Sequence, residues 1–253
     1  MYFRFLPFNF IVTNGKIITD CNKSSFDIWD GFRPIRQGWF FIKSQRAFAA
    51  ELQANGFGES RIKILAILTR LRQIACDPAM FLEGYDGGSG KLDMLEEVVS
   101  EAVEGGHRIL VFSQFTTMLG HISERLKALG ICYFYLDGST PPLERIHLVK
   151  AFNEGSMPVF LISLKAGGTG LNLTGADMVV HFDPWWNPAV EDQATDRAYR
   201  LGQKNNVQVL KFITKNTVEE KILKLQEAKR GVAEAIIPGQ DTWKSLTRED
   251  LEM

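Results

Sequence analysis

Short apolar runs alternate with amphipathic segments from about residue 92 to residue 229 of this chain of 253 residues. Runs of this kind, separated by helices, are typical of a parallel sheet that is covered on both faces. The predicted strands are Ile109–Phe112, Cys132–Tyr135, Val159–Ile162, Met178–His181 and Val207–Phe212. We therefore predict an α/β fold built on a parallel sheet with helices on both faces.

Amphipathic segments between these strands predict the covering helices. They are Leu92–Val103, Thr117–Leu129, Leu143–Phe152, Pro188–Leu201 and Val218–Lys229, and two further helices, Ser44–Leu52 and Ser60–Ile74, precede them. Asn187 suits a helix N-cap and Pro188 a first helical turn, and Gly130 suits a helix C-cap. The expected organisation is an unassigned segment 1–43, a helical approach segment 44–88, the α/β lobe 89–215, and a last helix with a polar tail, 216–253.

The polar residues that follow the predicted strands are candidates for a site, because ligands of open parallel sheets bind beyond the carboxyl ends of the strands. Ser113 and Gln114 follow the first strand, and hydroxyl and amide groups of this kind often contact phosphates of nucleic acid. They are also common helix caps, and each alone favours that interpretation.

A glycine-rich segment, Lys165 to Gly170, follows the third strand. Adjacent glycines such as Gly167 and Gly168 let backbone N–H groups approach an anion closely, while Thr169 adds a hydroxyl and Lys165 a charge. A tight turn from strand to helix explains the same glycines equally well, so this segment alone leaves both interpretations open.

Arg197 and Arg200 lie three residues apart in the predicted helix Pro188–Leu201, and Gln193 precedes Arg197 by four. On a helix this spacing places all three side chains on one side. The planar guanidinium fork of arginine suits phosphate, so the pair is a candidate grip on a transferring phosphoryl group. Most arginine pairs on helices are solvated surface, and the pair alone favours that interpretation.

The sequence lacks the usual means of holding a nucleotide unaided. A P-loop requires glycine where Tyr85 stands and a hydroxyl where Leu92 follows Lys91, and no acidic metal-binding box follows a strand. A dinucleotide enzyme is a weak alternative, because Leu173 occupies the position of the third glycine in the Rossmann pattern. The three cysteines, Cys21, Cys76 and Cys132, indicate neither a disulfide framework nor a zinc site.

Charge and hydropathy limit the partners. The net charge of −1 argues against binding of nucleic acid by overall basicity, although a local basic groove remains compatible with it. The apolar start of the chain, Met1–Val12, is too short and too interrupted by proline for a membrane span, and it lacks a signal-peptide cleavage site. We expect an intracellular protein without a membrane partner.

Five segments in order resemble the C-terminal RecA-like lobe of Swi/Snf-type DNA translocases, which are superfamily-two helicase-like ATPases. The segments are Ile109–Phe115, Leu136–Thr140, Ala166–Thr174, Asp183–Pro188 and Gln193–Gln203. The resemblance covers about residues 44 to 235, and Val218–Ile222 resembles the family's C-terminal brace helix. It implies a RecA-like sheet with an N-terminal helical extension and that brace helix, whereas residues 1–43 do not match the family's pattern.

The resemblance also implies roles for the candidate residues. Arg197 and Arg200 would be arginine fingers that reach the nucleotide across a cleft between two lobes, with Gln193, Gly168 and Gly170 ordering the face toward the nucleotide. A second set of residues would lie against the backbone of duplex DNA: Ser113, Gln114, Lys165 and Thr169. The glycine-rich turn would link the two contacts, and no metal ligand is expected among these residues.

The family's motor also needs a first lobe that carries the P-loop and the magnesium-binding acidic box, and this sequence has neither. We therefore expect no ATP hydrolysis by this chain alone, with ATP and Mg²⁺ bound only in a complete two-lobe motor. The chain would then be a fragment or the product of a split or truncated gene, with the first lobe, duplex DNA bound weakly and a remodelled protein target as partners. The expected location is the cytoplasm or nucleoid in a bacterium and the nucleus in a eukaryote. A non-catalytic DNA-binding or protein-interaction module derived from such a lobe is the alternative.

Overall fold

The computed structural model describes residues 11–13, 16–19, 61–167, 170–199, 206–214 and 217–233. The predicted helix Ser44–Leu52, most of the segment 1–43 and the polar tail from 239 onward lie outside the described residues. The expectations for those parts of the chain therefore stay predictions.

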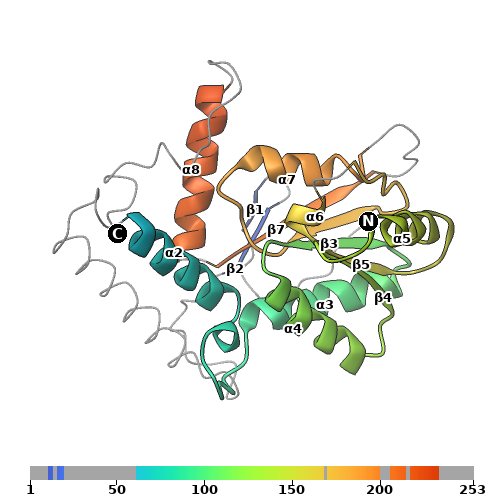
Figure 1. The fold of residues 1–253 in the computed structure, drawn as a ribbon, viewed down its shortest axis with the longest axis horizontal. Helices are drawn as coiled ribbons and strands as arrows, with labels where there is room; N and C mark the ends of the chain where they lie inside the picture. The colour runs from blue at the N-terminus through green and yellow to red at the C-terminus, as the bar shows by residue number, and fades with distance from the viewer. Residues whose placement is uncertain are drawn as a thin grey trace.

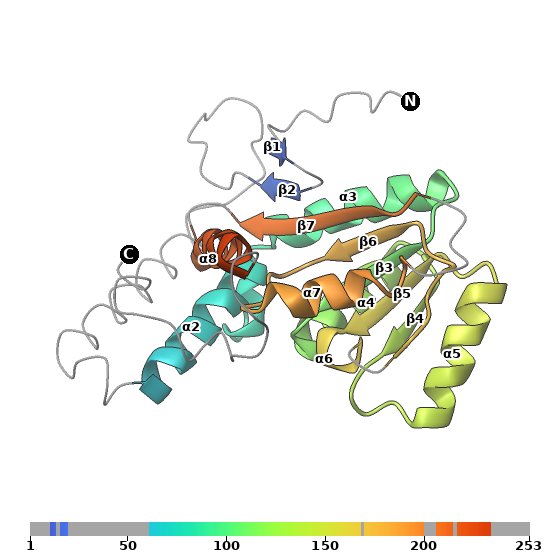
Figure 2. The ribbon, with the colours of Figure 1, turned by 90° about the horizontal axis from the view of Figure 1, so that it is seen from above.

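A parallel sheet of five strands forms the centre of the protein, as the sequence predicts. The strands are β3 (Ile109–Ser113), β4 (Tyr133–Leu136), β5 (Val159–Ser163), β6 (Met178–His181) and β7 (Gln208–Thr214). Their order is β7-β6-β3-β5-β4, so β3 lies in the middle, between β5 and β6. Their shared direction brings all the carboxyl ends to one edge of the sheet, on the side where α2 (Arg61–Cys76) and α8 (Val218–Ala233) lie (Figure 2).

Two short strands add to the β7 edge of this sheet. β2 (Lys16–Thr19) pairs parallel with β7, and β1 (Ile11–Thr13) pairs antiparallel with β2. The predicted parallel sheet is confirmed for the five central strands. β1 runs antiparallel to β2 because the two-residue connection between them is long enough for a hairpin and far too short for a parallel crossover.

Helices cover both faces of the sheet (Figure 1). One face carries α3 (Gly90–Glu104) and α4 (Thr116–Ala128), and the other carries α5 (Pro142–Glu154), the short α6 (Leu164–Gly167) and α7 (Pro188–Thr195). A single turn of 3₁₀ helix, η1 (Pro78–Met80), ends the approach from α2. Gly130 follows α4 with a φ of 70°, which confirms the predicted glycine stop.

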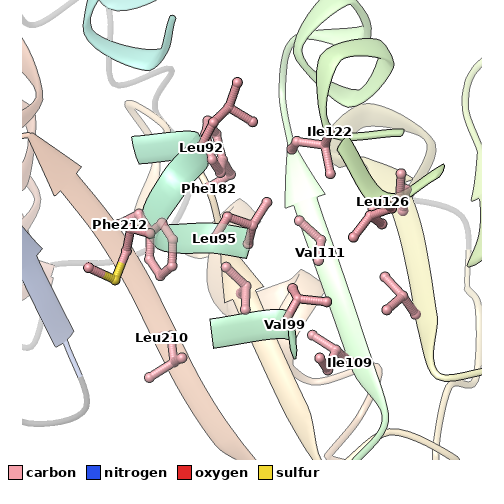
Figure 3. Close-up of a cluster of buried hydrophobic side chains, with 14 of the residues drawn as sticks. Leu92, Leu95, Val99, Ile109, Val111, Ile122, Leu126, Phe182, Leu210 and Phe212 are labelled. Atoms are coloured by element: carbon pink, nitrogen blue, oxygen red, sulfur yellow. The ribbon is translucent and has the colours of Figure 1, made fainter. Parts of the chain in front are cut away.

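Alternate residues of each strand feed two separate hydrophobic cores. In β3, Ile109 and Val111 pack toward α3 and α4, while Leu110 and Phe112 pack toward α5 to α7. Figure 3 shows the first of these cores, in which Leu92, Leu95 and Val99 of α3 face the strand residues. These four residues are essentially inaccessible to water, which explains why the strand is apolar from Ile109 to Phe112.

A third, smaller core joins α2 to α8. Leu68 and Leu71 of α2 pack against Val218 and Ile222 of α8, with Trp186 at the border. The approach helix and the predicted brace helix therefore pack against each other at the carboxyl edge of the sheet, beside the segments that the sequence singled out as a site.

Candidate functional site

The loops that follow β3 and β6 are joined by the buried carboxylate of Asp183. The Ser113 hydroxyl donates a hydrogen bond to Asp183 Oδ2, and the Gln114 amide N–H donates to Asp183 Oδ1 at 3.2 Å. Burial raises the pKa of the Asp183 carboxyl, and the nearby Arg72 and the Ser113 hydrogen bond act in the opposite direction. Ser113 is itself buried, so its hydroxyl supports the loop from inside instead of facing solvent.

Arg72 of α2 connects these two loops. Its Nη1 donates to Gln114 Oε1 at 2.8 Å, its Nη2 donates to the Pro184 carbonyl, and the same Nη2 lies 3.9 Å from Asp183 Oδ1. Three aromatic rings surround the guanidinium at 5.3–5.6 Å from its central carbon, those of Phe115, Trp185 and Trp186. We call these seven residues the Arg72 cluster. Cation–π contacts stabilise a buried guanidinium, and the aromatic rings also exclude water from it.

The start of α7 is fixed by a second buried carboxylate. Asn187 caps the helix by accepting the Ala189 N–H at 3.1 Å, as predicted. Glu191 accepts the Trp185 N–H at 2.6 Å, and it pairs with Lys211 of β7. Burial acts to raise the pKa of Glu191, but Lys211 and other partners outweigh it and the pKa is lowered.

The residues that follow the glycine-rich segment contact Arg197 directly. Leu173 N–H donates to the Arg197 carbonyl at 2.9 Å, and Arg197 Nη1 lies 3.5 Å from the Leu171 carbonyl oxygen. Gly170 has a φ of +59°, a conformation that suits glycine. Lys165 on α6 is exposed, whereas Gly168 and Thr169 lie outside the described residues. The turn after β5 and the segment after α7 are therefore joined by backbone hydrogen bonding.

The predicted helix Pro188–Leu201 is wrong at its carboxyl end. α7 stops at Thr195 and the chain continues in turns, because the Ala198 N–H bonds to Thr195 and the Arg197 carbonyl accepts from the distant Leu173. Arg197 is only 2% exposed while Gln193 is exposed, so these two side chains do not share one helix face. Arg200 lies outside the described residues.

Lys91, which follows the glycine-rich linker, is buried and does not belong to a phosphate-binding loop. It lies in the first turn of α3 behind the N-cap Ser89, and it is 3% exposed. Its ammonium group lies 2.6 Å from each carboxylate oxygen of Glu219. Burial acts to lower the pKa of Lys91, but Glu219 outweighs it and the pKa is raised. A lysine held in this way is not available to a phosphate, which agrees with the departure of the sequence from the P-loop pattern.

The sequence reasoning missed the buried charges Arg72, Asp183, Glu191 and Glu219. One signal was present for Arg72, because it follows Leu68 by four residues and so falls on the apolar stripe of its helix. Within the described ranges, no group of three or more His, Cys, Asp or Glu side chains could hold a metal ion, and no helix is long and apolar enough to cross a membrane.

Comparison with known proteins places this geometry in a family. Residues 90–202 match the helicase conserved C-terminal domain. The chain is 43% identical over 196 residues to a putative ATP-dependent helicase/translocase of Bacillus subtilis, covering 75% of this chain and 21% of that protein. It is 38% identical over 233 residues to the human SWI/SNF-related matrix-associated actin-dependent regulator of chromatin subfamily A member 1. That match covers 85% of this chain and 22% of the human protein. The chain thus spans less than a quarter of the length of these curated relatives.

Solved structures give the same assignment. The C-terminal domain of the Sulfolobus solfataricus SWI2/SNF2 ATPase superposes with a TM-score of 0.70 at 31% identity, covering 93% of this chain and 96% of that domain. The core of the same ATPase in complex with dsDNA superposes with a TM-score of 0.71 at 32% identity, covering 94% of this chain and 49% of that core. The RecA-like fold expected from the sequence is confirmed, and the chain belongs to the Swi/Snf-type helicases, of which it holds the C-terminal helicase domain.

Proposed function

We propose that this chain is the C-terminal motor lobe of a Swi/Snf-type DNA-dependent ATPase. In this proposal Arg197 and Arg200 stabilise the phosphates of a nucleotide held by a separate P-loop lobe, and Gln193, Gly168 and Gly170 order the face toward that lobe. ATP would supply the phosphoryl group and Mg²⁺ would neutralise its charge. By the resemblance to the family, the P-loop lobe carries the magnesium-binding acidic box, so we assign Mg²⁺ to that lobe.

The proposed DNA contacts lie on the loops after β3 and β5. Gln114, the exposed Lys165 and Thr169 would contact backbone phosphates of a duplex, and the buried Ser113 would contribute by fixing the Gln114 loop through Asp183. A similar ATPase core has been solved with dsDNA, which supports duplex DNA as the ligand. With few phosphates within reach, binding by this lobe alone should be weak and sensitive to salt.

The observation that carries the proposal is the hydrogen bonding between Arg197 and the Leu171–Leu173 segment. It fastens the residues that directly follow the proposed DNA contacts Lys165 and Thr169 to the segment that contains the proposed arginine finger Arg197. A displacement of one segment must therefore move the other, which is what a motor needs to couple nucleotide and DNA. A non-catalytic binding module would have no need for this connection.

The proposal is tested by adding the separately produced P-loop lobe of a relative and measuring ATP turnover with duplex DNA. We expect no turnover by the chain alone, DNA-stimulated turnover by the mixture, and a loss of about a thousandfold or more in Arg200→Ala, the scale typical of an arginine finger. Arg70→Ala, on the exposed side of α2, is the control and should keep the full rate. Turnover by the chain alone, or an Arg200→Ala mixture as active as the unaltered one, would contradict the proposal.

A further inference from the structure

Arg72 contacts both of the loops that leave the carboxyl ends of β3 and β6. It projects from the approach helix α2, 42 residues before Gln114 and 112 before Pro184, and it donates hydrogen bonds to both. The guanidinium is 3% exposed, so its bonds do not compete with solvent.

The contacts of residue 72 require the planar guanidinium group of arginine, which holds two donor nitrogens in fixed directions. One Nη reaches Gln114 while the other reaches Pro184 and approaches Asp183 at 3.9 Å, and the flat faces contact aromatic rings. Lysine would keep the charge, but its ammonium has neither the spread of donors nor the planar faces. Desolvation acts against a buried guanidinium, and its pKa is lowered accordingly, so a purely structural site would be filled more favourably by an apolar residue.

Gln114 depends on Arg72 for its orientation. Its Oε1 accepts from Arg72, whereas its Nε2 is buried and has no hydrogen-bond partner in the described structure. An unsatisfied buried amide group costs about 1–3 kcal/mol, and without Arg72 the Oε1 end of this amide would lose its hydrogen-bond partner as well.

We infer that Arg72 is a positioning residue that fixes the Gln114 side chain and locks the loop after β3, which carries a proposed DNA contact, to the loop that leads into α7. The inference deepens the proposed function and rests on it for the identity of the ligand. It also makes α2 the element through which the approach segment acts on the DNA contact.

The test is a double-mutant cycle on the affinity of the chain for a fluorescent DNA duplex at fixed low salt. We expect Gln114→Ala to weaken binding about fivefold, the effect of one hydrogen bond, and Arg72→Lys to weaken it by a similar factor. The double variant should bind no more weakly than Gln114→Ala, because Arg72 acts through Gln114. Arg70→Lys is the matched control, since Arg70 is exposed on the same helix and its guanidinium also lies over a ring, that of Phe81. Multiplying effects in the double variant, or unchanged affinity in a folded Arg72→Lys, would overturn the inference.

A second measurement separates this inference from the proposed function. Nuclear magnetic resonance of the unaltered chain should show the Gln114 side-chain amide as rigid as the backbone, and Arg72→Lys should make it mobile while Arg70→Lys does not. Rigid Gln114 together with no duplex binding would contradict the proposed function and leave the positioning role standing. A freely rotating Gln114 amide in the unaltered chain would refute the positioning role, even if Arg72→Lys fails to fold.

Discussion

Lys91 and Glu219, which are 128 residues apart, form a buried ion pair in which the ammonium lies 2.6 Å from both carboxylate oxygens. Glu219 Oε2 also accepts the Thr214 N–H at 2.8 Å, so the pair ties the first turn of α3 to the end of β7 and the start of α8. The brace helix is thus held to the lobe by a charge pair in addition to its apolar contacts.

Removing one member of this pair should cost more stability than removing both. Lys91→Met leaves a buried carboxylate without its counter-charge, and we expect it to lower the free energy of unfolding by about 3–5 kcal/mol. Lys91→Met combined with Glu219→Gln should recover part of that loss. Urea titration measures both, and Lys224→Met, which removes an exposed i,i+4 pair with Glu220, should change stability by less than about 0.5 kcal/mol. A double variant less stable than Lys91→Met would contradict this account.

Gly170 should resist substitution for reasons of backbone conformation alone. Its φ is +59°, and an added Cβ would meet no atom within 4 Å, so Gly170→Ala should cost about 1–2 kcal/mol without any clash. Gly120 in α4 has equally open space but helical geometry, and Gly120→Ala should therefore stabilise the protein by about 0.5–1 kcal/mol. Opposite shifts in the thermal midpoint are the expected result. If both alanine variants shifted the thermal midpoint in the same direction, the backbone φ would not be what determines the effect of substitution at these two glycines.

His181 should make the protein sensitive to acid. Burial lowers its pKa from 6.5 to about 4, so the unfolded chain binds the proton more readily than the folded one. Its contribution to stability is complete above pH 6.5 and is lost as the pH falls toward 4, which amounts to about 2 kcal/mol between pH 7 and 4.5. Urea titrations across this range should show a smaller loss in His181→Gln than in the unaltered chain. The control His147→Gln, at an exposed position, should lose as much stability in acid as the unaltered chain. If His181→Gln also lost as much as the unaltered chain, His181 would not be the source of the acid sensitivity.

The local features of this protein could be read from its sequence, whereas its long-range polar contacts could not. The strands were predictable because both of their faces are buried, as in Ile109–Ser113, and the start of α7 because Asn187 is a local cap. The early end of α7 was not, since it depends on Leu173 bonding to the Arg197 carbonyl from another loop. The Arg72 cluster was missed for the same reason, because helical periodicity marks a residue as buried without naming its partners.

Lys165 offers a direct test of the proposed DNA contact. It is an exposed cation on α6, at the carboxyl end of β5, and the proposal places a phosphate beside it. Each phosphate neutralised by the lobe should contribute about −0.9 to the slope of log affinity against log salt. Lys165→Ala should therefore weaken duplex binding and make that slope shallower by about one phosphate, for all duplex sequences alike. Lys127→Ala removes an exposed cation from α4, which covers the other face of the sheet, and should leave the slope unchanged. Equal slopes for the two variants would mean that the duplex does not contact the end of β5, and would remove Lys165 from the proposed interface.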